Sequence, residues 1–207
     1  DLATGSKADT IKSVSLTHLG ASTLSGNALE TLSLTGGAAI ASGTFAVTQS
    51  AGITTAGSIP TALTLNLAGL VGAVTATSDQ YTKLTINSAA NATVAALDFT
   101  KVTALDVAGA GVTTISALTS LGATAAITST GGGVTITSAL GNDQSFTGGA
   151  GKETISIGAT TKAITTGDGD DIVAVTASFG AGSVDAGLGS DTLTMTAADA
   201  ITASAST

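Results

Sequence analysis

The chain has 207 residues, and its six basic residues are all lysines set against 14 acids, which gives a net charge of −8. An acidic protein without arginine offers phosphate backbones no electrostatic footprint, so we do not expect nucleic acid as a partner. No apolar run is long enough to cross a bilayer, so we do not expect membrane insertion. The absence of cysteine excludes disulfides and thiolate metal sites.

Short apolar triplets recur along the chain, and each consists of one small or polar residue with one aliphatic residue on either side. Side chains alternate between the two faces of a strand, so each triplet directs two aliphatics inward and its central residue outward. The central residues are Ser15, Ser33, Thr64, Thr85, Asp106, Thr135, Ser156, Ala174 and Thr194. The chain is therefore predicted to be all-β, with a helix considered only for residues 92–97.

The spacing of the triplets indicates how the strands are arranged. Leu65, Ile86 and Val107 follow one another at equal intervals, and the interval between Ile155 and Val173 is only slightly shorter. A chain that advances one coil per roughly 20 residues stacks equivalent side chains in ladders, which predicts a parallel β-solenoid, or β-helix. A sandwich of antiparallel hairpins is the alternative, but it explains neither this period nor the scarcity of aromatic residues.

The composition changes beyond about residue 141, since eight of the 14 acids lie between there and the end of the chain. Segments 148–156, 166–174 and 186–194 each match the nonapeptide GGxGxDxUx, in which U is a large aliphatic. The acid at the sixth position is Glu153, Asp171 or Asp191. Glycines let backbone carbonyls point into such a turn and the acid adds a carboxylate, and Ca²⁺ binds about six to eight oxygens of this kind.

These repeats resemble those of the RTX (repeats-in-toxin) family of secreted bacterial proteins. The resemblance implies a Ca²⁺-binding β-roll over residues 141–207 that continues a Thr/Ala/Gly-rich solenoid over residues 1–140. In the family one Ca²⁺ lies between successive turns of a flank, so three stacked turns imply two sites. The implied ligands are Gly149, Gly151, Glu153, Gly167, Asp168, Gly169, Asp170, Asp171, Asp185, Gly187, Gly189 and Asp191. Glutamate replaces the usual aspartate at position 153, which weakens the case for the first site.

No HExxH, GxSxG or Walker motif occurs, and we do not expect an enzyme. A threonine-rich solenoid also raises the possibility of ice binding, which needs a continuous outward threonine array. Asp106 and Ala174 interrupt that array, so ice binding is disfavoured.

The whole composition is similar to that of self-assembling S-layer proteins of the Caulobacter type, which are exported by type I secretion. This second resemblance implies a structural protein on the bacterial cell surface that folds and self-assembles on binding Ca²⁺. Its implied partners are other copies of itself, with a cell-surface polysaccharide as a further candidate. Two alternatives stay open, namely a segment of an RTX adhesin and a calcium-dependent export or folding domain of a secreted enzyme.

Overall fold

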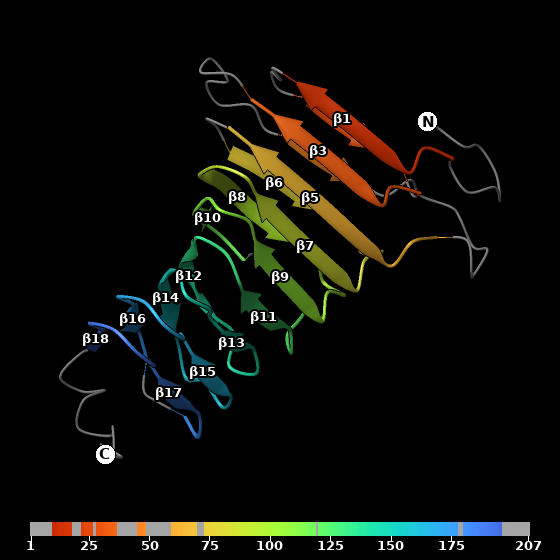
Figure 1. Ribbon diagram of the computed structural model, residues 1–207. Coiled ribbons are helices and arrows are strands. Elements are labelled where there is room, and N and C mark those ends of the chain that lie inside the picture. Colours follow the sequence, from red (N-terminus) through yellow and green to blue (C-terminus); the bar gives the residue numbers. More distant parts are fainter. Residues whose placement is uncertain are drawn as a thin grey trace.

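The computed structural model describes residues 10–17, 22–26, 28–36, 45–48, 59–69, 73–118, 120–177 and 180–195. Two parallel β-sheets, stacked as layers, run along an elongated molecule, with β1 (Ser13–Thr17) at one end and β18 (Thr192–Met195) at the other (Figure 1). The larger sheet has nine strands in chain order. They are β1 (Ser13–Thr17), β3 (Thr31–Thr35), β5 (Ala62–Ala68), β7 (Lys83–Ser88), β9 (Ala104–Ala108), β11 (Ala126–Ser129), β13 (Ser145–Thr147), β15 (Ala163–Thr165) and β17 (Ser183–Asp185).

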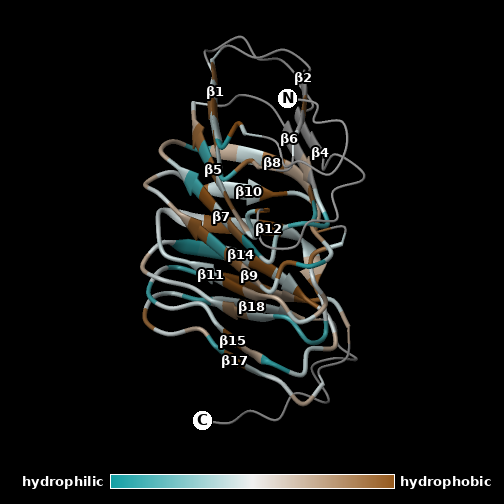
Figure 2. Cartoon of the chain, turned by 90° about the vertical axis from the view of Figure 1, so that its right-hand side faces the viewer, coloured by the Kyte–Doolittle hydropathy of each residue, from teal (hydrophilic) through white to brown (hydrophobic). Residues whose placement is uncertain are grey.

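The second sheet has seven strands, also parallel and in chain order. They are β6 (Ala73–Thr77), β8 (Ala92–Asp98), β10 (Thr113–Ile115), β12 (Gly133–Leu140), β14 (Lys152–Ile157), β16 (Ile172–Val175) and β18 (Thr192–Met195). A further parallel pair joins β2 (Ser22–Ser25) to β4 (Phe45–Thr48). From β5 onward the chain alternates between the two large sheets, so each coil contributes one strand to each of them (Figure 2).

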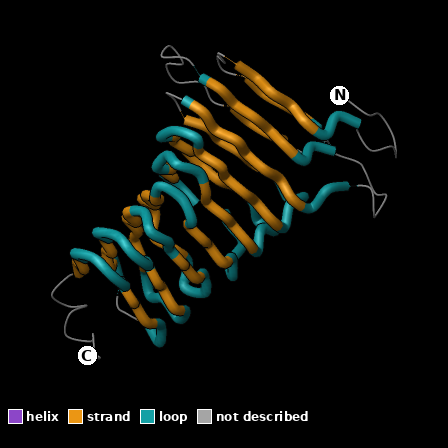
Figure 3. The backbone as a smooth tube through the Cα atoms, in the orientation of Figure 1, coloured by secondary structure: helices purple, strands orange, loops and turns teal. Residues whose placement is uncertain are grey.

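The predicted all-β parallel solenoid is confirmed, and the antiparallel sandwich is wrong, because the paired strands run parallel. The helix considered for residues 92–97 is also wrong. Those residues lie in β8, where Ala92 and Val94 are buried and Thr93 between them is half-buried, the alternation of a strand. Strands and loops make up the described part of the chain (Figure 3), which contains no helix that could span a membrane.

The core is a set of aliphatic ladders between the two sheets. Leu65 pairs with Ile86 and Ile86 with Val107 on successive coils, and all three side chains are buried, as their equal spacing in the sequence predicts. The number of residues between paired core positions changes along the molecule. It is slightly larger between Leu105 and Ile127 and smaller between Ile155 and Val173. The length of a coil therefore varies along the stack.

The triplets divide between the two sheets, which sequence periodicity alone does not show. The first five lie in the nine-stranded sheet and the last four, from the triplet of Thr135 onward, in the seven-stranded sheet. Their central residues therefore face opposite sides of the molecule and do not form one outward array. Both sheets continue without interruption past residue 140, since β11 pairs with β13 and β12 pairs with β14.

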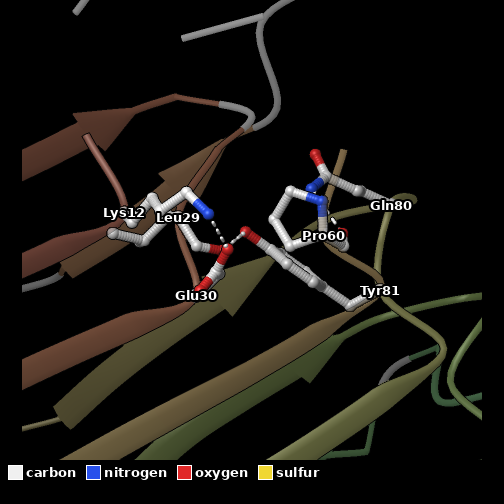
Figure 4. A network of polar contacts seen from close by, with 6 residues as sticks. All are labelled: Lys12, Leu29, Glu30, Pro60, Gln80 and Tyr81. Carbon is white, nitrogen blue, oxygen red and sulfur yellow. Dashed lines mark hydrogen bonds and ion pairs between the residues drawn. The ribbon is translucent and has the colours of Figure 1, made fainter. Parts of the chain in front are cut away.

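Polar contacts join the corners of the first coils, where each chain segment enters a strand of the nine-stranded sheet (Figure 4). The buried hydroxyl of Tyr81, just before β7, donates to the carbonyl oxygen of Leu29, just before β3, at 2.7 Å. Burial, and then the nearby charge of Glu30, raises the pKa of this hydroxyl above its ordinary value. Lys12 and Glu30 form an exposed ion pair at 2.9 Å. The Tyr81 contact spans two coils and fixes their relative position.

Candidate functional site

The three glycine-aspartate turns lie directly above one another on the flank where the chain passes from the nine-stranded to the seven-stranded sheet. The strands that follow the turns are in register, because Ile155 pairs with Val173 and Val173 with Leu193. The backbones of successive turns are also bonded, since the N–H of Asp168 donates to the carbonyl of Gly149 at 2.6 Å. The turns form a continuous column.

Glycine is required at the fourth position of the second and third turns because the backbone there is both strained and crowded. Gly169 and Gly189 have φ angles of +140° and +141°, which side chains rarely adopt. A Cβ on Gly169 would collide with the carbonyl oxygen of Gly151, and one on Gly189 with that of Gly169. The absence of side chains thus leaves backbone carbonyls of adjacent coils in close stacking.

The acids at the sixth position form a second column, which we call the acid ladder and which consists of Glu153, Asp171 and Asp191. The N–H of Glu153 donates to Asp171 Oδ1 at 2.8 Å, and the N–H of Asp171 donates to Asp191 Oδ1 at 3.1 Å. Each aspartate therefore caps the backbone of the coil before it. The ladder continues a column of the seven-stranded sheet in which Thr113 pairs with Val134 and Val134 with Glu153.

Two members of the acid ladder are withdrawn from solvent, and their charges are not fully compensated. Glu153 is 0% exposed and Asp171 is 1% exposed, and Oε2 of the first and Oδ2 of the second are buried without a hydrogen-bond partner. The pKa of Glu153 is raised from about 4.5 to about 7, mainly because the group is buried and also because the Asp171 carboxyl lies beside it. Hydrogen bonds from Ser129 and Gly149 oppose this rise. Two buried carboxylates in contact need either a proton or a cation between them.

The other acids expected as ligands lie outside the ladder. Asp168, Asp170 and Asp185 are not buried as Glu153 and Asp171 are. Oδ1 of Asp170 accepts from the N–H of Ser190 at 2.9 Å, and Oδ1 of Asp185 accepts from the N–H of Gly187 at 3.1 Å. These two carboxylates hold the outer backbone of the turns, so the structure does not bring them together with the buried pair.

Ser129 belongs to the site although the nonapeptide pattern does not include it. This serine is buried at the end of β11, and its hydroxyl donates to Glu153 Oε1 at 2.9 Å. Its signal in the sequence is its place one coil after Val107, with which it pairs in the inward ladder. At this place an aliphatic side chain would otherwise be expected.

The donor set fits a hard cation whose ligands are oxygens. The described residues hold no group of three or more His, Cys, Asp or Glu side chains placed to bind one metal ion, so a cation here would need backbone carbonyls as well. The stacked turns that carry Glu153 and Asp171 bring glycine carbonyls of adjacent coils close together, and Ca²⁺ commonly combines carboxylates with backbone carbonyls. The sequence matches no protein-family model, and no curated protein matches it significantly.

Proposed function

We propose that the acid ladder binds Ca²⁺ and that the bound ions fix the C-terminal coils of a self-assembling structural protein of the bacterial cell surface. The observation that carries the proposal is the pair of buried, unpartnered carboxylate oxygens on Glu153 and Asp171. An isolated buried charge costs several kcal/mol, and two like charges in contact cost more, unless a cation neutralises them.

The ligands follow from the two columns. Glu153 and Asp171, with carbonyls of the turns at 148–153 and 166–171, would hold a first ion. Asp171 and Asp191, with carbonyls of the turns at 166–171 and 186–191, would hold a second. Bound Ca²⁺ supplies positive charge between neighbouring coils, and its binding free energy adds to the free energy of folding.

The outer surface supports a structural rather than a catalytic role. The outward column of the nine-stranded sheet runs through Thr64, Thr85, Asp106 and Thr128, and its three threonines lose little side-chain entropy when an interface orders them. At the C-terminal end Leu188 and Leu193 are 72% and 51% exposed. A cavity of about 190 Å³ opens beside Leu193. We infer that copies of the chain contact one another through such faces once calcium has fixed their shape.

The test is a calcium titration of the full chain, followed by far-UV circular dichroism and analytical sedimentation. Wild type should gain β-structure and then form large assemblies that a chelator dissolves. Asp171→Asn, which changes both proposed sites, should abolish both responses. Asp106→Asn removes the same charge from a half-buried outward residue paired with Lys83 at 2.7 Å, far from the acid ladder, and it should keep the calcium-dependent gain of β-structure seen in wild type.

Each part of the proposal has its own contrary result. A spectrum unchanged by calcium and chelator, with no binding detected by calorimetry, would refute the calcium site. Calcium binding by a chain that stays monomeric at millimolar Ca²⁺ would refute self-assembly, and it would favour the adhesin segment or the export domain.

A further inference from the structure

The hydrogen-bonding pattern of the acid ladder changes at its first member, Glu153. Asp191 accepts the N–H of Asp171, and Asp171 accepts the N–H of Glu153, each one coil earlier in the chain. By the same rule Glu153 would accept the N–H of Val134, its pairing partner on the preceding coil. Its Oε1 instead accepts the hydroxyl of Ser129, which reaches it from the nine-stranded sheet. The ladder therefore ends on a contact across the core.

Two exceptions in the sequence coincide at this contact. Glu153 is the one glutamate at the sixth position of the three turns, and its side chain is a methylene longer than that of aspartate. Ser129 interrupts a ladder that otherwise holds Leu65, Ile86 and Val107, and it is only 1% exposed. A serine buries less apolar surface in such a column than valine or isoleucine would, and here its hydroxyl meets the longer carboxylate.

The contact has a defined effect on the carboxylate oxygens. The hydroxyl of Ser129 engages Oε1 of Glu153, while Oε2 remains buried without a partner. The carboxylate is thus held from one side, with its other oxygen left for a ligand. Outer-sphere donors of this kind orient metal-binding carboxylates in proteins, and their removal typically lowers metal affinity by about 10- to 100-fold.

Building on the proposed calcium role, we infer that Ser129 is a positioning residue for the first calcium site and that the Ser129–Glu153 pair closes the cation column at its N-terminal end. The coil before Glu153 carries Val134 at the equivalent position, which offers no carboxylate oxygen to continue the column. Within the described residues, which end at 195, two gaps remain, between Glu153 and Asp171 and between Asp171 and Asp191. The chain should accordingly bind two Ca²⁺ ions in this column, of which only one depends on Ser129.

The experiment is isothermal titration calorimetry of the full chain with Ca²⁺ alone. Ser129→Ala should weaken one of the two sites by about 10- to 100-fold and leave the other within about two-fold of wild type. Ser129→Thr keeps the hydroxyl in a side chain shaped like the aliphatics of the ladder, and it should restore the affinity.

A matched control exists in the same core. Ser88 and Thr113 form another buried hydroxyl pair at 2.7 Å between the two sheets, and Thr113 lies two coils before Glu153 in the same column. Ser88→Ala therefore removes a comparable hydrogen bond and should leave both calcium affinities unchanged. Urea unfolding of both alanine variants without calcium measures how much general stability each has lost.

The outcomes separate this inference from the proposed function. If wild type binds calcium and Ser129→Ala binds it equally well at both sites, the positioning role is refuted while the calcium site stands. If Ser129→Ala and Ser88→Ala weaken binding equally, Ser129 acts only through stability and the inference is again overturned. If wild type binds no calcium, the proposed function and this inference fall together.

Discussion

Acidifying the calcium-free protein should stabilise it, and one buried side chain should account for most of the effect. Burial raises the pKa of Glu153 to about 7 in the folded protein, against about 4.5 in an unfolded chain. Between these values the folded state holds a proton that the unfolded state has released, so the free energy of unfolding falls as the pH rises. A difference of about 2.5 between the two pKa values corresponds to about 3 kcal/mol. The loss is complete above the folded-state pKa, and it is absent below the unfolded-state pKa.

Urea unfolding of calcium-free protein, followed by circular dichroism at pH values that span these two pKa values, measures this effect. Glu153→Gln is neutral at every pH, so its stability should lack most of this pH dependence and should exceed that of wild type at the alkaline end. Saturating calcium should reverse the sign in wild type, because the ion binds the deprotonated carboxylate and its affinity increases with pH. An equal pH dependence in wild type and Glu153→Gln would contradict the reasoning.

Two further substitutions test the fold that carries the site. Gly169→Ala forces a φ of +140° on alanine and drives its Cβ into the Gly151 carbonyl, so it should lower the free energy of unfolding by more than the roughly 1–3 kcal/mol of backbone strain alone. Gly158→Ala is the control, because its Cβ would lie 3.8 Å from the nearest neighbouring atom, and it should change the urea midpoint little. Similar effects of the two substitutions would count against the turn geometry. Tyr81→Phe removes the hydrogen bond to Leu29 and should lower the free energy of unfolding by about 1 kcal/mol, with no change in calcium affinity. Thermal unfolding and calorimetry test these two expectations, and an unchanged melting temperature would mean that the contact contributes nothing to stability.

The ladders of the core can be predicted from sequence because their signal is local and repeated. Leu65, Ile86 and Val107 each sit in a triplet whose alternation indicates a strand, and their equal intervals indicate stacking. The division of the triplets between two sheets cannot be obtained in this way. The interval from Leu32 to its partner Leu65 exceeds the interval from Leu65 to Ile86 by more than half. Because coil length is not constant, counting residues alone does not give the strand register.

The acid ladder could be predicted in part. The sixth position of the nonapeptide correctly identifies Glu153, Asp171 and Asp191 as one column. The sixth position of the nonapeptide also separates buried Asp171 from exposed Asp170, which composition alone treats as equivalent. Ser129 lies far from Glu153 in the sequence and on the opposite sheet, so its role depends on how two coils face each other across the core.

The hydrogen bonds between coils run along the long axis of the stack, because every coil pairs in parallel with the next. Tension applied between the two ends therefore pulls in the direction of these bonds and opens the coils one at a time, whereas tension along the strands must shear a whole strand at once. The acid ladder lies on a single flank, so ions bound there would hold neighbouring coils together on that side only. Under load the C-terminal coils would then bend, with the opposite flank as the compliant side.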